Sequence, residues 1–347
     1  MATDHETWLT LTQEEALDPD LPICDPHHHL WDYPNNRYLL EELLQDLGGG
    51  HRVTQTVFVE CVSMYRKDGP EEMRPVGETE FVQGVAAQSA SGNYGPTAVA
   101  AGIVSLANLA LGPAVESVLK AHMAASHNRF RGIRHATSWH PHEKIRNAHT
   151  HPPEGLLLDA TFRQGFACLH KLGLSFDAWM YHTQLADLVD LAHAFPDATI
   201  ILDHIGGPLG IGPYAGKQDE VMQVWKKGMA DLARCQNVVV KLGGVTMPMC
   251  GFGWHRWEKP PTSEEVARAT APYYLFCIEQ FGVDRCMFES NFPVDKASCS
   301  YTVLWNSFKR IVQDFSPDER VALFHDTAAR AYKIQPAAQL TPLHPPC

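Results

Sequence analysis

Two runs of β-forming residues, Ser-Phe-Asp-Ala-Trp-Met-Tyr (175–181) and Thr-Ile-Ile-Leu-Asp-His (199–204), enclose the amphipathic segment 184–194. Within that segment the apolar side chains follow the i, i+3, i+4, i+7 spacing of a helix with one buried face, at Leu185, Leu188, Val189 and Ala192. Pro196 ends the helix, because proline cannot continue it. The stretch 175–204 therefore predicts a strand, a helix and a second strand.

The same alternation of a short β-rich run and a longer amphipathic segment continues along the chain. The expected strands are residues 22–28, 53–59, 98–104, 130–135, 175–181, 199–204, 238–242 and 286–290. Strand and helix repeated eight times is the pattern of an α/β protein with one parallel sheet closed into a (β/α)8 barrel, with the active site at the C-terminal ends of the strands. An open doubly wound sheet is the alternative, but no Gly-x-Gly-x-x-Gly sequence follows the first strand.

We expect a single domain over residues 1–347, because no internal repeat and no convincing linker interrupts the pattern. Residues 1–20 form an N-terminal extension in this interpretation. Residues 335–347 are rich in proline and are expected to be a loosely held C-terminal tail. Three irregular segments that follow strands, 66–75, 138–154 and 248–261, are predicted substrate-binding loops.

The composition excludes several classes of partner. The 347 residues carry a formal net charge of −12 and no basic run offsets it, so nucleic acid and anionic membranes are not expected partners. No apolar run reaches the roughly 20 residues that a membrane-spanning helix needs. The nine cysteines are scattered without a Cys-x-x-Cys pair, and the N-terminus lacks the features of a secretory signal. We therefore expect a reduced, cytoplasmic protein.

The first expected strand ends in three consecutive histidines, within Asp-Pro-His-His-His-Leu-Trp (25–31). Residues two apart in a strand face the same way, so we expect Asp25, His27 and His29 to share one face. His28 then points to the other face, where we expect it to pack against the helix layer. His27 and His29 are spaced to bind one cation or one substrate at the barrel mouth. A structural role is the default for a lone histidine, but this pattern favours a site.

Two later motifs also place polar side chains at strand ends. Ile-Ile-Leu-Asp-His-Ile-Gly-Gly-Pro (200–208) ends a β-rich run with His204 before a Gly-Gly-Pro turn. Met-Phe-Glu-Ser-Asn-Phe-Pro-Val-Asp (287–295) ends the last strand with Glu289, Asn291 and Asp295 in close succession. In a parallel barrel these ends converge on one face, so we expect the side chains of all three motifs to gather around a single cavity.

With these three motifs the sequence resembles the amidohydrolase-related family of the amidohydrolase superfamily, over about residues 23–332. The residues that carry the resemblance are Asp-x-His-x-His-Leu-Trp, Leu-Asp-His-x-Gly-x-Pro and Ser-Asn-x-Pro. The branch it resembles most contains 2-pyrone-4,6-dicarboxylate lactonase and sugar lactonases. The resemblance implies a (β/α)8 fold and hydrolysis of a carbonyl compound, commonly a lactone; related branches decarboxylate aromatic acids.

The resemblance also implies roles for individual residues. His27 and His29 match the His-x-His that binds a divalent metal in many members or contacts substrate in others. His204 matches the sixth-strand histidine, placed to polarise a carbonyl or to handle a proton. The eighth-strand position is normally Asp, which is both metal ligand and base, but this chain has Asn291, whose amide cannot take a proton. Asp295 and Glu289 are the nearest replacements; we prefer Asp295 slightly, with a solvated turn residue as its alternative.

Further candidate residues follow from their positions at strand ends. His182, after the fifth strand, is a third candidate metal ligand. Arg134 with His135 could clamp a carboxylate, and Arg131 flanks the same strand; an ion pair to a helix is the alternative for these arginines. Lys241 ends the seventh strand and, if buried, needs a carboxylate partner, for which Asp295 or Glu289 is expected. Glu60, which ends the second strand, could instead hold a neighbouring lysine or arginine in place.

Aromatic residues are frequent in the expected loops. Trp31 and Tyr181 are taken as substrate-binding, with simple packing as the alternative for each. Their number favours a flat or ring-shaped organic substrate. Neither a phosphate-binding glycine loop nor a Gly-x-Ser-x-Gly nucleophile elbow is present, so a nucleotide enzyme and a serine hydrolase are poorly supported.

These observations predict a hydrolase that opens a lactone by direct attack of water on its carbonyl. A bound metal would be Zn²⁺ or Mn²⁺, held by His27 and His29 with His182 or His204; catalysis without metal is an equal alternative, with the histidines and Arg134 stabilising the oxyanion. The other hypotheses are a metal-dependent decarboxylase of an aromatic or unsaturated acid and a non-catalytic binding barrel. The expected partner is a small cyclic or aromatic carbonyl compound, and a homo-oligomer stays open.

Overall fold

The fold is described by a computed structural model, which covers residues 5–34, 36–126 and 128–334. Its main sheet has eight parallel strands in the order β1, β4, β5, β6, β7, β8, β9, β10. Their bounds are β1 Ile23–His28, β4 Val53–Val59, β5 Ala98–Ser105, β6 Phe130–Ile133, β7 Ser175–Ala178, β8 Ile200–Leu202, β9 Val238–Leu242 and β10 Cys286–Phe288. All eight predicted strands are confirmed, several ending two or three residues earlier than expected.

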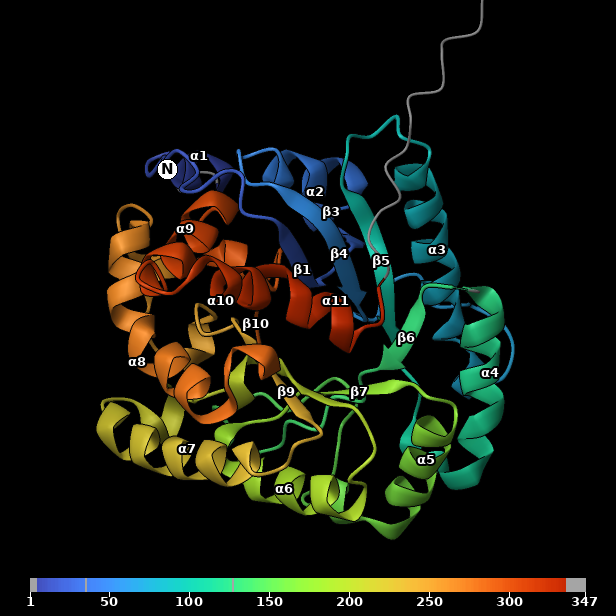
Figure 1. The fold of residues 1–347 in the computed structure, drawn as a ribbon. Coiled ribbons are helices and arrows are strands. Elements are labelled where there is room, and N and C mark those ends of the chain that lie inside the picture. The colour runs from blue at the N-terminus through green and yellow to red at the C-terminus, as the bar shows by residue number, and fades with distance from the viewer. Residues whose placement is uncertain (1–4, 35, 127, 335–347) are drawn as a thin grey trace, which may run out of the picture.

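The sheet curves into a nearly closed barrel, the (β/α)8 fold that the sequence predicts (Figure 1). The last strand returns to the first just beyond β10, where the backbone N–H of His29 donates to the carbonyl of Phe292 at 2.7 Å. The N–H of Asn291 likewise donates to the carbonyl of His27 at 2.9 Å. Closure therefore takes place at the C-terminal ends of the strands, next to the motifs that the sequence singled out.

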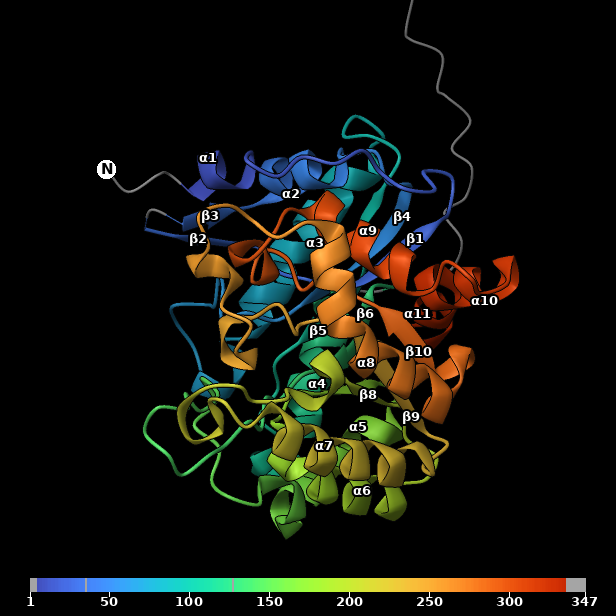
Figure 2. The same ribbon diagram turned by 90° about the vertical axis from the view of Figure 1, so that its left-hand side faces the viewer.

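Helices surround the barrel, as Figures 1 and 2 show. The longer ones are α2 Leu40–Leu47, α3 Val76–Ala90, α4 Val115–Ala125, α5 Ala160–Lys171, α6 Leu185–Ala194, α7 Gln218–Ala233, α8 Ser263–Phe281 and α9 Tyr301–Ile311. The short ones are α1 His5–Leu9, α10 Pro317–Val321 and α11 Thr327–Ala331. The predicted helix 184–194 is confirmed as α6, which ends just before Pro196 as expected. Thr262 and Glu265 form a capping box that starts α8, and the Ser300 side chain caps α9.

The apolar core has two parts. Most of it lies between the outer face of the sheet and the helices, and it includes Phe58, Phe176 and Trp305. A smaller cluster joins inward-facing strand residues to the segment around α11, through Cys24, Val57, Val59, Val104, Ile201, Met287, Ala328, Tyr332 and Ile334. The C-terminal segment of the described chain therefore fills the lower part of the barrel, as expected for a barrel with a packed interior.

Two features near the N-terminus were not predicted. A short antiparallel hairpin, β2 Trp31–Tyr33 and β3 Asn36–Tyr38, follows β1 directly. The segment before β1 packs onto α8 and α9, because Glu14 accepts hydrogen bonds from the Ser263 backbone and the Asn306 side chain. The predicted tail 335–347 lies outside the described residues. Among the helices of residues 5–334 that are described, none has the length and apolar character needed to cross a bilayer.

Candidate active site

Parallel strands put their C-terminal ends on one side of the barrel, and a set of buried polar side chains gathers there. They come from the ends of seven different strands or from the residues just after them. The set consists of His27, His29, Glu60, Arg134, Asp177, Asp203, His204, Lys241 and Glu289, each less than 9% exposed. The distant motifs meet as expected, since the His27 ring packs against the rings of both His29 and His204.

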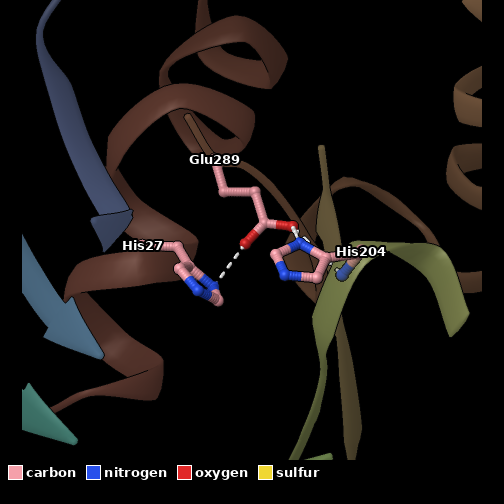
Figure 3. Close-up of side chains that lie close together, drawn as sticks. All are labelled: His27, His204 and Glu289. Atoms are coloured by element: carbon pink, nitrogen blue, oxygen red, sulfur yellow. Dashed lines mark hydrogen bonds and ion pairs between the residues drawn. The ribbon is translucent and has the colours of Figure 1, made fainter. Parts of the chain in front are cut away.

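Glu289 lies between two of the histidines, as Figure 3 shows. Its Oε1 is 2.6 Å from Nδ1 of His204 and also accepts the backbone N–H of His204 at 3.0 Å. Its Oε2 is 2.8 Å from Nδ1 of His27, but the angles of this ion-pair contact do not make a hydrogen bond, so Oε2 has no donor among the described residues. Burial alone would raise the pKa of Glu289; His204 and His27 outweigh it and lower the pKa to about 2.

The two histidines of the first strand face each other. Nε2 of His27 lies 3.3 Å from Nε2 of His29. Nδ1 of His29 lies 2.8 Å from the carbonyl oxygen of Val59, which only accepts hydrogen bonds, so this nitrogen carries the proton and Nε2 is a free lone pair. Burial lowers the pKa of both histidines, and nearby cationic groups lower it further. Both rings are therefore neutral and available as ligands or hydrogen-bond acceptors.

Lys241 is a fully buried cation with three polar neighbours. Its Nζ donates to Asp177 at 2.7 Å, lies 2.9 Å from Asp203 and lies 3.1 Å from Nδ1 of His27. Burial lowers the pKa of Lys241, but the two carboxylates raise it above its ordinary value, so it stays charged. The prediction that Asp295 or Glu289 would be its partner was wrong. The partners are Asp177 in β7 and Asp203 just after β8. Strand β8 lies between β7 and β9, the strand that carries Lys241.

Arg134 is held by Glu60, as the sequence suggested for an arginine near the second strand. Nε of Arg134 donates to Oε1 of Glu60 at 2.8 Å, and a second nitrogen donates to the Glu60 carbonyl. Nη1 of Arg134 lies 3.3 Å from Nε2 of His27. From the loop 138–154, His149 reaches the other Glu60 oxygen at 3.3 Å. Arg134 is thus fixed beside His27, and its Nη1 also lies 3.7 Å from Oδ2 of Asp203.

Asn291 and Asp295 form a separate pair beside the cluster. Asn291 has a left-handed backbone with φ of 54°. Its side chain therefore does not point to the same face as that of Glu289, as the two-residue alternation of a regular strand would predict. Its amide donates to Oδ1 of Asp295 at 3.2 Å, while Oδ2 of Asp295 is buried with no hydrogen-bond partner in the described chain. Burial raises the pKa of Asp295 to about 7. It is therefore a carboxyl that can exchange a proton near neutral pH.

His204 is positioned by a strained turn. Both His204 and Ile205 have positive φ, 53° and 48°, which is unfavourable for residues with a Cβ. Gly244 packs against the imidazole so closely that a Cβ on it would lie 2.4 Å from Cγ of His204. The ring also packs edge-on against Trp179 at 4.8 Å and against the His27 ring at 4.6 Å. The turn and its neighbours hold the imidazole in one orientation.

The residues fit a divalent cation. Ligand atoms of His27, His204 and Glu289 lie within 4.8 Å of one another. Oε2 of Glu289 lies 2.8 Å from Nδ1 of His27 and accepts no hydrogen bond from the described residues. The fully buried carboxylates of this cluster also outnumber its cations, Lys241 and Arg134: they are Glu60, Asp177, Asp203 and Glu289. A cation would balance this excess charge, which is costly in a buried site.

Three predicted site residues lie outside this group. His182 is in a 3-10 turn, where its Nδ1 accepts the backbone N–H of Leu209 at 3.3 Å and its ring packs against Tyr214. The hydroxyl of Tyr181 donates to the Arg146 carbonyl. Trp31, in β2, stacks its ring on His29 at 5.9 Å and is partly exposed. Of the three, only Trp31 touches a member of the cluster.

Asp25 does not share the face of His27, contrary to the prediction. Its carboxylate accepts hydrogen bonds from the Tyr301 hydroxyl and the Ser290 backbone, each at 3.0 Å. The reason is a register shift between Asp25 and His28, which interrupts the two-residue alternation of the strand. His28 packs outside the cluster as expected, with Nε2 2.9 Å from the Thr56 hydroxyl.

The pairing of Arg134 with His135 was also not found. His135 accepts the backbone N–H of Leu109 and packs against Phe162 in the helix layer. Arg131 lies near the opposite end of the barrel, two residues into β6. Because neighbouring strand residues point to opposite faces, Arg134 and His135 could not both face the cavity.

Sequence reasoning missed Asp177, Asp203 and His149. Asp177 and Asp203 are charged residues inside otherwise apolar strand runs, Ser-Phe-Asp-Ala and Ile-Ile-Leu-Asp. A buried strand tolerates a carboxylate only when it is paired, so these two residues could have been recognised as partners for a buried cation such as Lys241. His149 lies in a loop that the sequence identified, but nothing in its spacing indicated a contact with Glu60.

A family model described as amidohydrolase matches residues 24–334. This chain belongs to the amidohydrolase family. A relative from Sinorhizobium fredii (strain NBRC 101917 / NGR234), called uncharacterized protein y4mH, is 35% identical over 337 residues, which are 91% of this chain and 99% of the relative.

Two solved structures share the fold of this amidohydrolase. An amidohydrolase from Burkholderia multivorans with bound zinc is 22% identical, with 90% of this chain and 99% of that chain covered and a TM-score of 0.68. A putative 2-pyrone-4,6-dicarboxylic acid hydrolase from Pseudomonas putida is 16% identical, with 91% and 98% covered and a TM-score of 0.60. At these identities the likeness concerns the barrel, and the protein is an enzyme of the amidohydrolase family whose reaction must be argued from its site.

Proposed function

We propose that this enzyme hydrolyses a lactone, or a similar cyclic ester of an organic acid, by direct attack of water. One observation carries the proposal: the Glu289 carboxylate joins His27 and His204 at 2.8 and 2.6 Å in a buried cluster that also holds Arg134 and Lys241. Histidines, cations and carboxylates gathered at the C-terminal ends of the strands can bind a carbonyl, stabilise an oxyanion and activate water without a nucleophilic serine.

His204 is the group that polarises the carbonyl in this proposal. Glu289 accepts a hydrogen bond from Nδ1 of His204 at 2.6 Å, and its negative charge lies next to the ring. Nε2 on the other side of the ring then donates to the substrate carbonyl oxygen. The strained turn and Gly244 keep this nitrogen in place, so little reorganisation is needed as negative charge develops.

Asp295 is the proposed base. Its pKa, raised to about 7 by burial, lets it accept a proton from water and return it near neutral pH. The water oxygen bonds to the carbonyl carbon, the ring C–O bond breaks, and the proton ends on the released hydroxyl. The product is a hydroxy acid that loses one further proton to solvent at neutral pH.

Arg134 is proposed to bind an anionic group of the substrate. Glu60 holds its Nε, and its Nη1, which lies 3.3 Å from His27 and 3.7 Å from Asp203, is the nitrogen that would pair with a substrate carboxylate. Trp31 and Tyr181 remain proposed contacts for the flat part of the substrate. The likeness to a putative 2-pyrone-4,6-dicarboxylic acid hydrolase supports this substrate class, which combines a ring ester with carboxylates.

A divalent ion, Zn²⁺ or Mn²⁺, is the proposed cofactor, and the zinc in the Burkholderia multivorans amidohydrolase supports it. His27, His204 and Glu289 would hold it, with His29 as a further ligand. In the metal-bound form the ion, and not His204, would polarise the carbonyl, because a ligating ring nitrogen cannot also donate a hydrogen bond; the ion would also lower the pKa of a water ligand.

The test is a panel of lactones, including 2-pyrone-4,6-dicarboxylate and sugar lactones, assayed with a pH indicator. Lactone opening releases protons and no carbon dioxide, whereas decarboxylation of an aromatic acid releases carbon dioxide. Wild type is compared with His204→Ala and with the exposed-site control His193→Ala. Turnover lost only in His204→Ala is expected; equal turnover in both variants would contradict the proposal, and gas release would favour the decarboxylase.

A further inference from the structure

A hollow lies at the other end of the barrel from His27, where the strands begin. It has a volume of about 570 Å³ and is bounded by the early residues of β4, β5 and β6, the end of α3 and the residues after α11. In Figure 1 these elements stand together on the side of the barrel away from α6 to α8. It is separate from the proposed active site, because Glu289 and His204 lie at the other end of the barrel, where the strands end.

The space arises from small side chains and an irregular strand. Alanines from α3 and β5 line it, at positions 86, 90, 98 and 101. Ala100 within β5 has a positive φ of 52°, and the pairing of β4 with β5 shifts register between Gln55 and Val57. Such bulges redirect side chains and are frequent beside binding sites. The strand thus carries a strained conformation at this cavity.

The lining is positively charged. It includes Arg129, Arg131 and Lys333, and none of its residues is Asp or Glu. This contrasts with the whole chain, whose net charge is −12. An unneutralised group of cations in a hollow attracts anions, because low-dielectric walls concentrate its field.

Arg131 is the most informative of these cations. It is only partly exposed, its Nε is buried without a hydrogen-bond partner among the described residues, and its Nη1 reaches only the carbonyl of Phe130, at 3.3 Å. No ion pair to a carboxylate is found for Arg131 or Arg129 within the part of the chain that the structure describes. Burial and then the neighbouring Arg129 lower the pKa of Arg131. A guanidinium in this situation gains from an oxyanion partner.

We infer that this hollow binds a small molecule with two or more anionic oxygens, such as a phosphate ester or a polycarboxylate. The Arg131 guanidinium supplies a fork for one oxyanion, and Arg129 and Lys333 add positive charge to the lining, the Nζ of Lys333 donating to the Gly173 carbonyl at 2.9 Å. Asn128 adds a neutral side-chain amide to the lining, whereas the Ser89 hydroxyl already donates to the Thr97 carbonyl at 2.8 Å. The size of the hollow suits a ligand of several heavy atoms rather than a single chloride.

The test is calorimetric titration of the full chain with inorganic pyrophosphate and, separately, with citrate, at constant ionic strength. Saturable binding of one or both is expected, and which one binds distinguishes the phosphate from the carboxylate source. Arg131→Gln should weaken binding at least about tenfold, equal to about 1.4 kcal/mol. The control Arg234→Gln changes an exposed arginine and should leave the affinity unchanged.

Two further variants keep the test decisive. Ala90→Asp places a negative charge at the exposed rim of the hollow and should weaken binding even if Arg131→Gln unfolds. His204→Ala should leave the affinity unchanged, because the active site is at the opposite end. No saturable heat with either anion would overturn the inference, and so would binding that His204→Ala abolishes while Arg131→Gln and Ala90→Asp retain it.

Discussion

Nδ1 of His204 lies 2.6 Å from Oε1 of Glu289, and the backbone N–H of His204 donates to the same oxygen at 3.0 Å. One carboxylate oxygen therefore fixes both the ring and the turn that carries it. The other oxygen of Glu289 faces His27. Glu289, which follows β10, therefore connects His204, just after β8, with His27, at the end of β1.

Replacing this carboxylate should impair catalysis more than folding. Glu289→Gln keeps the shape of the side chain but removes the negative charge that lies between His204 and His27, so kcat/KM should fall about 100-fold or more. The matched control is Glu279→Gln, at an exposed position of α8. Circular dichroism and lactone turnover check both variants; retained activity in Glu289→Gln would exclude its proposed role.

Asn291→Asp should make stability depend on metal. The new carboxylate would stand next to Asp295, whose Oδ1 lies 3.2 Å from the Asn291 amide nitrogen. Two adjacent buried carboxylates repel, so in chelator the free energy of unfolding should fall by about 1–3 kcal/mol, with part recovered on adding Zn²⁺. Thermal unfolding with EDTA and with zinc measures this, with Asn237→Asp as a control outside the cluster. Equal losses under both conditions would argue against cation binding near this position.

Zinc itself should bind and stabilise the wild-type protein. A cation at His27, His204 and Glu289 binds only the folded chain, so Tm should rise by about 5 °C at saturating zinc. Metal analysis after dialysis should give about one ion per chain. His204→Ala should lose both effects, whereas His193→Ala, at an exposed position of α6, should keep them. A zinc-independent Tm and no retained metal would favour catalysis without metal.

Stability should decrease with rising pH because of Asp295. Its pKa is raised from 3.8 to about 7 in the folded chain, so between these values the unfolded chain holds fewer protons than the folded one. Protonated Asp295 therefore makes its full contribution to the free energy of unfolding below the unfolded-state pKa of 3.8. This contribution is lost as the pH rises through about 7. Each unit of such a shift corresponds to about 1.4 kcal/mol.

The check is urea unfolding from about pH 5 to pH 8. Asp295→Asn removes the titrating group and should flatten the decline, whereas Asp197→Asn, at an exposed position, should not. Identical slopes in wild type and Asp295→Asn would show that Asp295 does not titrate in this range.

Lys241→Met should be strongly destabilising. Without the ammonium, Asp177 and Asp203 lose a partner at 2.7 and 2.9 Å and remain fully buried. Removing one side of a buried ion pair costs about 3–5 kcal/mol. Urea unfolding should show this loss, with less than about 0.5 kcal/mol for the exposed control Lys227→Met. Adding Asp177→Asn to Lys241→Met should restore part of the stability; a loss no larger than the control's would disprove the pairing.

The sequence by itself determined the barrel and the strand ends on which the site is built. The order of strands and helices follows from local patterns, apolar runs of four to eight residues and helical stripes between them, which depend little on the rest of the chain. Because parallel strands converge at one end, the motifs at His27, His29 and His204 could be placed around one cavity before any coordinates.

Tertiary structure alone decided which charges meet. The positive φ of Asn291 turns its amide to Asp295 and leaves Glu289 to contact both histidines, and the register shift in β1 takes Asp25 away from His27. The partners of Lys241 come from β7 and the residue after β8, and those of Arg134 from the end of β4. Contacts between strands depend on register and side-chain direction to within a few ångströms, and a one-dimensional pattern does not carry that information.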